Sequence, residues 1–144
     1  MSGERLPVTA FNELPADAAV ELLRPLCGSA AWQRVLVAGR PFGSVAELAA
    51  TSDGVLTALG WSDVQAALAT EPETSPAAVE GSEEAVTYEG RFGVPFLADP
   101  TGRTAEQLRA ALAERLAADE AEEQRTVRRE LAAIVRVRVA VTFA

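Results

Sequence analysis

The stretch FGVPFLADPTGRTAEQLRAALAERL, from Phe92 to Leu116, contains the clearest signals for how this chain folds. Its apolar run from Val94 to Ala98 lies between Gly93 and the turn sequence DPTG, which predicts either a short strand or an extended loop buried against helices. Thr104 and Gln107 then form the S/T-x-x-E/Q pattern that marks a helix start. Apolar residues recur downstream on one helical stripe, so an amphipathic helix is expected after the loop.

Similar signals mark helices in the first half of the chain. Ser44 with Glu47, and Ser62 with Gln65, repeat the capping-box spacing and predict two further helix starts. Another helix is expected between the cap Ser29 and the terminator Gly39. An earlier helix is expected to begin after a proline at position 15 and to end near the glycine at position 28.

The C-terminal part predicts a long helix after Asp119 that reaches about Val139, because its valines and leucines continue one helical stripe without a breaker. This helix is expected to pack in an antiparallel pair with the preceding one. A Pro-containing acidic segment, at about residues 71–82, is expected to be an irregular surface loop. Together these patterns predict an all-α fold, a single compact domain over residues 1–144 with about seven or eight helices.

Composition limits the classes of function. The 144 residues are 49% hydrophobic, which suits one ordinary domain. Thirteen basic and 21 acidic residues leave a formal net charge of −8. This negative charge repels nucleic acids and anionic membranes, so neither is expected as a partner. No apolar run approaches the roughly 20 residues of a membrane span, and the first residues lack the apolar core of a signal peptide, so a cytoplasmic location is expected.

Missing residue types exclude several kinds of chemistry. The single cysteine, Cys27, and the absence of histidine argue against a disulfide or a transition-metal site. All basic residues are arginine, which excludes a lysine Schiff base. No glycine-rich phosphate loop is present, so no nucleotide cofactor is expected. The lack of lysine, with Ile134 as the only isoleucine, is typical of a GC-rich bacterial genome.

Several motifs occur in an order that identifies a family resemblance. FNELP at Phe11 to Pro15 precedes CGSAAW at Cys27 to Trp32 and RPF at Arg40 to Phe42, and the YEGRFG sequence from Tyr88 leads into FGVPF. This order resembles the 2-oxo-4-hydroxy-4-carboxy-5-ureidoimidazoline (OHCU) decarboxylase family of urate breakdown. The resemblance implies an all-α fold, and loss of a carboxylate from a ureido-substituted imidazoline on the route to allantoin.

The chain departs from that family in its middle. The catalytic histidine of the family is expected in an HP dipeptide, and Glu71-Pro72 stands in its place. The interval that follows is contracted, with Ser82 and Glu84 as the remnant of a serine-glutamate motif and Glu83 as the alternative to Glu84. The chain is therefore similar to a diverged family member that lacks the histidine.

The resemblance implies a set of site residues. Arg138 is the candidate anion-binding arginine, with Arg136 the less favoured choice, and the FGVPF loop is expected to line the substrate cavity. The candidate catalytic residues are Glu71, Glu84 and Arg138, and the candidate substrate-binding residues are Pro72, Ser82, Tyr88, Phe92, Val94, Phe96 and Leu97.

Each candidate also has a purely structural interpretation. General residue preferences favour solvated surface for Glu71, and an ionised Glu71 would repel a substrate carboxylate unless burial kept it protonated. Arg138 is equally well explained by a pair with Glu122, Glu130 or the acidic loop. Core packing is favoured for Cys27, and it is the simplest role for the aromatic residues Trp32, Phe92 and Phe96.

Three functional hypotheses follow. The first is a diverged, cofactor-independent lyase or cyclase that acts on a bacterial, even specialised, metabolite through a shaped pocket with an arginine anchor. The second is authentic ureidoimidazoline decarboxylation, with Glu71 in place of the histidine. The third is a non-catalytic ligand-binding or partner protein on the same frame. The expected partner is a small-molecule substrate, and the resemblance also implies a homodimer.

Overall fold

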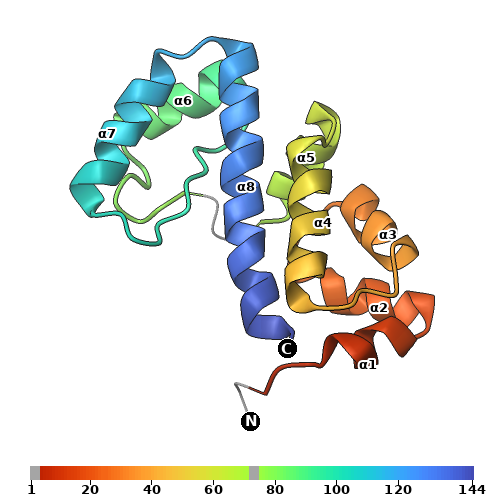
Figure 1. The fold of residues 1–144 in the computed structure, drawn as a ribbon. Helices are drawn as coiled ribbons and strands as arrows, with labels where there is room; N and C mark the ends of the chain where they lie inside the picture. Colours follow the sequence, from red (N-terminus) through yellow and green to blue (C-terminus); the bar gives the residue numbers. More distant parts are fainter. Residues whose placement is uncertain (1–3, 72–74) are drawn as a thin grey trace.

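The computed structural model describes residues 4–71 and 75–144, and within these residues it is all-helical (Figure 1). The expected all-α fold is confirmed, at the upper end of the predicted helix count. The helices described are α1 (Val8–Glu13), α2 (Ala16–Leu23), α3 (Ala30–Ala38), α4 (Val45–Thr57), α5 (Trp61–Ala69), α6 (Glu83–Phe92), α7 (Ala105–Leu116) and α8 (Glu120–Thr142). None of the described helices is long and apolar enough to cross a bilayer.

Side-chain caps define several of these helix starts. Thr104 and Gln107 form the complete predicted capping box, with both reciprocal hydrogen bonds present. Ser29 caps α3 as predicted, and Gly39 follows the last residue of that helix. Ser44 caps α4 by accepting a hydrogen bond from the amide of Glu47. The carboxylate of Glu47 accepts from the amide of Gly43 and not from that of Ser44, so only one of the two capping-box bonds is present.

The predicted cap at Ser62 is wrong. Helix α5 begins at Trp61, with Gly60 as its N-cap residue and no side-chain cap. Ser62 therefore already lies inside the first turn, where its own backbone is helical and its hydroxyl no longer has the capping geometry. A pattern of spacing alone does not distinguish a residue before the helix from one inside it.

Helix α8 is the central element of the fold (Figure 1). It buries Val127, Leu131, Val135 and Val139, and α4 is the helix that packs most extensively against it. Helix α7 packs on α6 instead. The predicted antiparallel pair of the last two helices is therefore wrong, because the apolar stripe of α8 is covered mainly by α4.

The end of α8 lies beside the start of the described chain. The helix continues past the predicted end to Thr142, whose carbonyl accepts a hydrogen bond from the amide of Leu6 at 2.8 Å. Ala144 returns a bond to the Leu6 carbonyl at 2.9 Å, and Leu6 and Phe143 form an isolated bridge. The alternating sequence RVRVAVTF is therefore helical almost to its end, and the strand-like ending is a single bridge.

The FGVPF segment is a buried extended loop, one of the two predicted alternatives. Gly93, with φ +75°, ends α6 in the left-handed conformation that glycine adopts without strain. Val94, Phe96 and Leu97 are then at most 2% exposed. The loop connects α6 to α7, and the amide of Asp99 in the turn that follows donates a hydrogen bond to Glu130 of α8.

The N-terminal motifs form a structural clasp. The side chain of Asn12 donates to the carbonyl of Phe42 at 2.8 Å and accepts from the amide of Phe42 at 2.9 Å. Arg40 donates to the carbonyls of Phe11 and Leu14. FNELP and RPF therefore hold α1 to the segment before α4, and their role in this chain is architectural.

Candidate functional site

A cleft of about 950 Å³ opens between α6, α8 and the two loops at residues 75–81 and 95–101. Leu108 of α7 contributes one side chain to its wall. The lining residues are Ser75, Pro76, Ala77, Ala78, Glu80, Gly81, Ala85, Val86, Glu89, Pro95, Ala98, Asp99, Pro100, Thr101, Leu108, Ile134, Val137 and Arg138. Its volume lies in the range typical of small-molecule sites.

Hydrogen bonds fix the two loops that border this cleft. The hydroxyl of Ser75 donates to the carbonyl of Phe96 at 3.1 Å and joins one loop to the other. Glu130 of α8 accepts from the amide of Asp99 at 2.9 Å and forms an ion pair with Arg103 at 2.8 Å. The cleft wall at residues 95–101 is therefore attached to α8 at its turn.

Arg138 lies in the cleft wall and forms an ion pair with Glu71. Two guanidinium nitrogens donate to the two carboxylate oxygens of Glu71 at 2.9 and 2.6 Å, and one of them also donates to the carbonyl of Leu26 at 3.0 Å. The side chain of Glu71 is only 7% exposed and that of Arg138 is 28% exposed. Such two-point contacts are among the stronger charge-assisted hydrogen bonds.

This pair decides between several sequence-based alternatives. The interpretation of Glu71 as solvated surface is wrong, because its carboxylate is buried against an arginine 67 residues away in the chain. Among the described residues, Glu71 at the start of the acidic loop pairs with Arg138, whereas Glu130 pairs with Arg103. Arg136 is directed elsewhere, in an exposed pair with Asp53, so Arg138 is the arginine at the cleft.

The other predicted site residues are not gathered around the cleft. Tyr88, Phe92, Val94, Phe96 and Leu97 are 0–8% exposed and belong to the core, while Pro95 and Ala98 of the same loop line the cleft. Ser82 accepts a hydrogen bond from the amide of Ala85 as the N-cap of α6, and Glu84 is exposed in the first turn of that helix. Pro72 lies outside the described residues.

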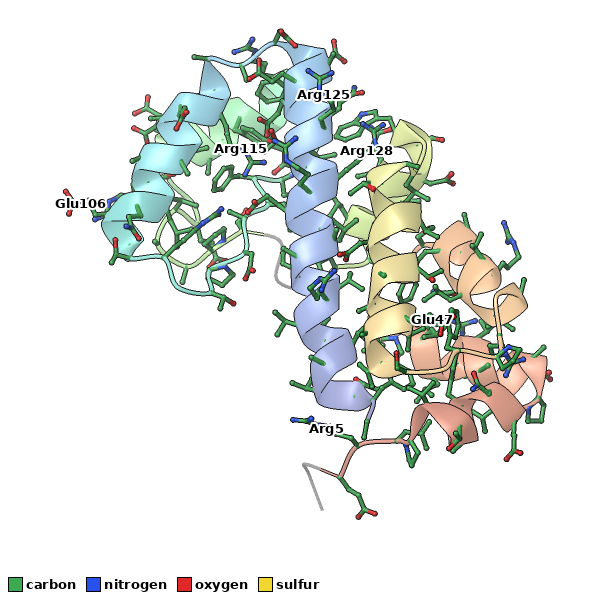
Figure 2. The ribbon with its side chains drawn as sticks, in the orientation of Figure 1. Arg5, Glu47, Glu106, Arg115, Arg125 and Arg128 are labelled. Atoms are coloured by element: carbon green, nitrogen blue, oxygen red, sulfur yellow. The ribbon has the colours of Figure 1, made fainter. Side chains whose placement is uncertain are left out.

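A buried polar cluster that the sequence patterns do not predict joins α6, α7 and α8. Arg115 of α7 donates through Nε to Glu123 of α8 at 2.8 Å and through another nitrogen to the carbonyl of Leu97 at 2.6 Å. Tyr88 donates its hydroxyl to Glu123, which is 1% exposed. Arg115 also stacks over the ring of Phe96, 4.5 Å from its centroid. Figure 2 shows Arg115 directed from α7 toward α8, while Glu106 of the same helix points outward.

The surroundings of Tyr88 in this cluster keep its phenol protonated. Burial raises the pKa of Tyr88 well above its ordinary value, and Glu123 adds to this, while Arg115 opposes it. Tyr88 is therefore a hydrogen-bond donor to Glu123 at any physiological pH. The sequence contains one signal for this cluster. Arg115 interrupts the apolar stripe of its helix, and Glu123 follows eight residues later in the first turn of the next helix.

A second cleft, of about 630 Å³, lies between Glu71 and the region of α2 and α3. Its lining residues are Glu21, Arg24, Pro25, Cys27, Gly28, Ala30, Gln33, Thr70 and Glu71. Cys27 is 2% exposed, and burial raises the pKa of its thiol, so the expected core-packing role is supported. In the described part of the chain, no three His, Cys, Asp or Glu side chains are grouped so as to hold a metal ion.

Comparisons with known proteins agree with this architecture. The structure is similar to the crystal structure of (S)-allantoin synthase, with TM-score 0.79 and 18% identity, over 96% of this chain and 54% of that one. It is also similar to a crystal structure of OHCU decarboxylase in the presence of (S)-allantoin, with TM-score 0.69 and 22% identity, over 82% of this chain and 94% of that one. The chain thus spans about half the length of the allantoin synthase chain.

The sequence itself carries the family assignment. No curated protein matches the chain. The family model described as OHCU decarboxylase matches residues 12–86 and 73–140, two segments that overlap where the sequence predicts a contraction. Together they extend over most of the chain. The chain therefore belongs to the OHCU decarboxylase family.

Proposed function

We propose that this chain is a cofactor-independent small-molecule enzyme, a lyase or cyclase, that binds its substrate in the 950 Å³ cleft. The observation that carries the proposal is the meeting of Arg138, from α8, with the FGVPF loop at one cleft of ligand size. These two features come from distant parts of the sequence, and the family resemblance assigns both to substrate binding. Family membership supports an enzyme, while the substrate is part of the proposal.

The walls of the cleft favour catalysis by shape. Apart from its few charged groups, the lining consists mainly of alanine, proline, valine and other apolar side chains. Such a surface holds a flexible substrate in one conformer without polar contacts. Proximity and orientation alone supply roughly 7 to 11 kcal/mol in the best intramolecular cases.

Authentic ureidoimidazoline decarboxylation is the second candidate, and family membership favours it. The ion pair argues against it on two grounds. Both carboxylate oxygens of Glu71 accept hydrogen bonds from Arg138, and Glu71 is not among the lining residues of the 950 Å³ cleft, so it is not placed as a proton donor to a substrate there. The same contacts occupy the arginine that the substrate carboxylate would need. A non-catalytic binding protein is the third candidate, and turnover distinguishes it.

A direct assay separates these candidates. Purified protein is incubated with freshly generated ureidoimidazoline carboxylate, and optically active allantoin is followed by circular dichroism beside the spontaneous reaction. We expect no acceleration over the spontaneous rate. Acceleration would establish the decarboxylation candidate and contradict our choice of another substrate.

A turnover screen with a blocked cleft tests the proposal itself. Native protein is incubated with pools of small metabolites, and consumption is followed by mass spectrometry. The variant Ala85→Phe fills the cleft from α6, and Ala113→Phe, at an exposed position of α7, is the matched control. We expect turnover that is lost only in Ala85→Phe. Turnover that survives in Ala85→Phe would place the chemistry elsewhere, and binding without turnover would favour the third candidate.

A further inference from the structure

The cleft contains an arginine whose charge is balanced by a carboxylate. Arg138 lines the cleft, and both carboxylate oxygens of Glu71 accept hydrogen bonds from it. Glu71 lines the second cleft, so the two members of the ion pair border different clefts. Because the Glu71 side chain is 7% exposed, water screens the pair on that side only weakly.

The remaining charges of the cleft are negative. Within the described lining, Arg138 is the one basic residue, and Glu80, Glu89 and Asp99 contribute carboxylates. Glu80 and Glu89 are both exposed. The arginine is neutralised locally by Glu71, so the field inside the cleft is set by the acidic groups and is unfavourable for an anion.

We propose that Glu71 is the residue that determines charge specificity, so that the cleft takes a neutral or cationic substrate in preference to a carboxylate. This inference rests on the proposed function, because it describes the substrate of the same cleft. A free arginine is a strong carboxylate receptor through paired N–H donors. Glu71 uses the same donors, and a substrate carboxylate would have to displace it from a nearly buried position.

The test measures binding, so that it does not depend on turnover. The probes are 3-phenylpropanoate, 3-phenylpropanamide and 3-phenylpropylammonium, which share one apolar part and differ in charge. Dissociation constants for native protein are measured by calorimetry at low ionic strength. We expect the ammonium and amide probes to bind more tightly than the carboxylate, and all binding to be lost in Ala85→Phe.

The variant Glu71→Gln then removes the negative charge that Glu71 places against Arg138. We expect its preference to shift toward the carboxylate by about tenfold or more, the effect of one unit charge close to the ligand at intermediate dielectric. Glu106→Gln changes the net charge equally at an exposed residue that points outward from α7 and does not line the cleft, and it should retain the native order (Figure 2). The double variant Glu71→Gln/Arg138→Gln, with no net change at the pair, should also retain the native order.

Three results would overturn the inference. They are carboxylate binding to native protein that equals amide binding, an unchanged order in folded Glu71→Gln, or no binding of any probe to folded native protein. The order of the probes on native protein is a test even if Glu71→Gln does not fold. Failure of the proposed function has a different signature, which is the expected binding order without any turnover.

Discussion

At the scale of single residues, the buried ion pair of Arg115 and Glu123 is the interaction most sensitive to substitution. Glu123 is 1% exposed, and one of its oxygens has no hydrogen-bond partner among the described residues. Removing only the arginine would leave an uncompensated carboxylate in the core. Breaking a buried pair in this way typically costs about 3 to 5 kcal/mol.

We therefore expect Arg115→Met to lower the free energy of unfolding by about 3 to 5 kcal/mol, measured by urea denaturation. Arg109→Met, at an exposed position of the same helix, should change it by less than about 0.5 kcal/mol. The double variant Arg115→Met/Glu123→Leu should recover part of the loss, because it removes the stranded charge. Equal losses of stability in Arg115→Met and Arg109→Met would contradict a stabilising role for the buried ion pair.

Cys27 gives a prediction for pH. Burial raises the pKa of its thiol above the ordinary value of 9.0, and the Glu71 carboxylate adds to this, although the Ser29 backbone and Arg138 oppose it. The unfolded chain therefore releases this proton at a lower pH than the folded chain does. The contribution to stability is complete below the ordinary pKa and falls as pH rises above it, by at most about 1.4 kcal/mol per pH unit.

The measurement is the free energy of unfolding at pH values from about 8 to 9.5, for native protein and for Cys27→Ala. The native protein should lose stability over this window, and the variant should lose less, whatever its stability at pH 8. Tyr88, whose ordinary pKa is 10.0, contributes mainly at higher pH in both proteins. Parallel curves for the two proteins would contradict the role of the thiol.

Residue burial was the level least accessible to sequence. General residue preferences favour the surface over a pocket role for Glu71, because glutamate is usually exposed, and the arginine that it pairs with is 67 residues away in the chain. Arg115 stood on an apolar stripe but had no visible partner until α7 and α8 were placed. In contrast, Cys27 and the aromatic residues at 32, 92 and 96 are buried as their type suggests.

At the scale of elements, helix existence was well predicted because capping and periodicity are local. The starts of α3, α4, α7 and α8 follow the expected residues. Helix α1 was missed because its six residues are too few to show a period. The pairing of α8 with α4 was also missed, because it depends on contacts between distant parts of the chain.

The two T/S-x-x-Q patterns differ in the structure, and this difference can be measured. Thr104→Ala removes a cap with two reciprocal hydrogen bonds, and it should lower the free energy of unfolding by about 1 kcal/mol. Ser62→Ala removes an exposed hydroxyl inside the first turn of α5, and it should change stability by less than about 0.5 kcal/mol. Urea denaturation measures both changes. An equal loss of stability in the two variants would indicate that Ser62 does cap α5, which contradicts the structure.

At the scale of the whole molecule, the connection between α2 and α3 lies close to the Glu71–Arg138 pair. Gly28, in the connection from α2 to α3, lies against Thr70 at the end of α5. Thr70 immediately precedes Glu71, and Leu26 accepts a hydrogen bond from Arg138. The position of the cleft-lining arginine is therefore tied to a close approach between two segments far apart in sequence, which no local pattern predicts.

This close approach predicts a strong coupling between two small substitutions. A Cβ added at Gly28 would collide with the Thr70 hydroxyl, and a β-branched side chain has little freedom to turn away. Gly28→Ala should therefore destabilise the protein by about 1 to 3 kcal/mol, as overpacking does. Thr70→Ala removes the colliding atom and loses only the bond to the Ala67 carbonyl. The double variant should be more stable than the sum of the single effects by about 1 kcal/mol or more in a double-mutant cycle. Additive effects would contradict a close contact between Gly28 and Thr70.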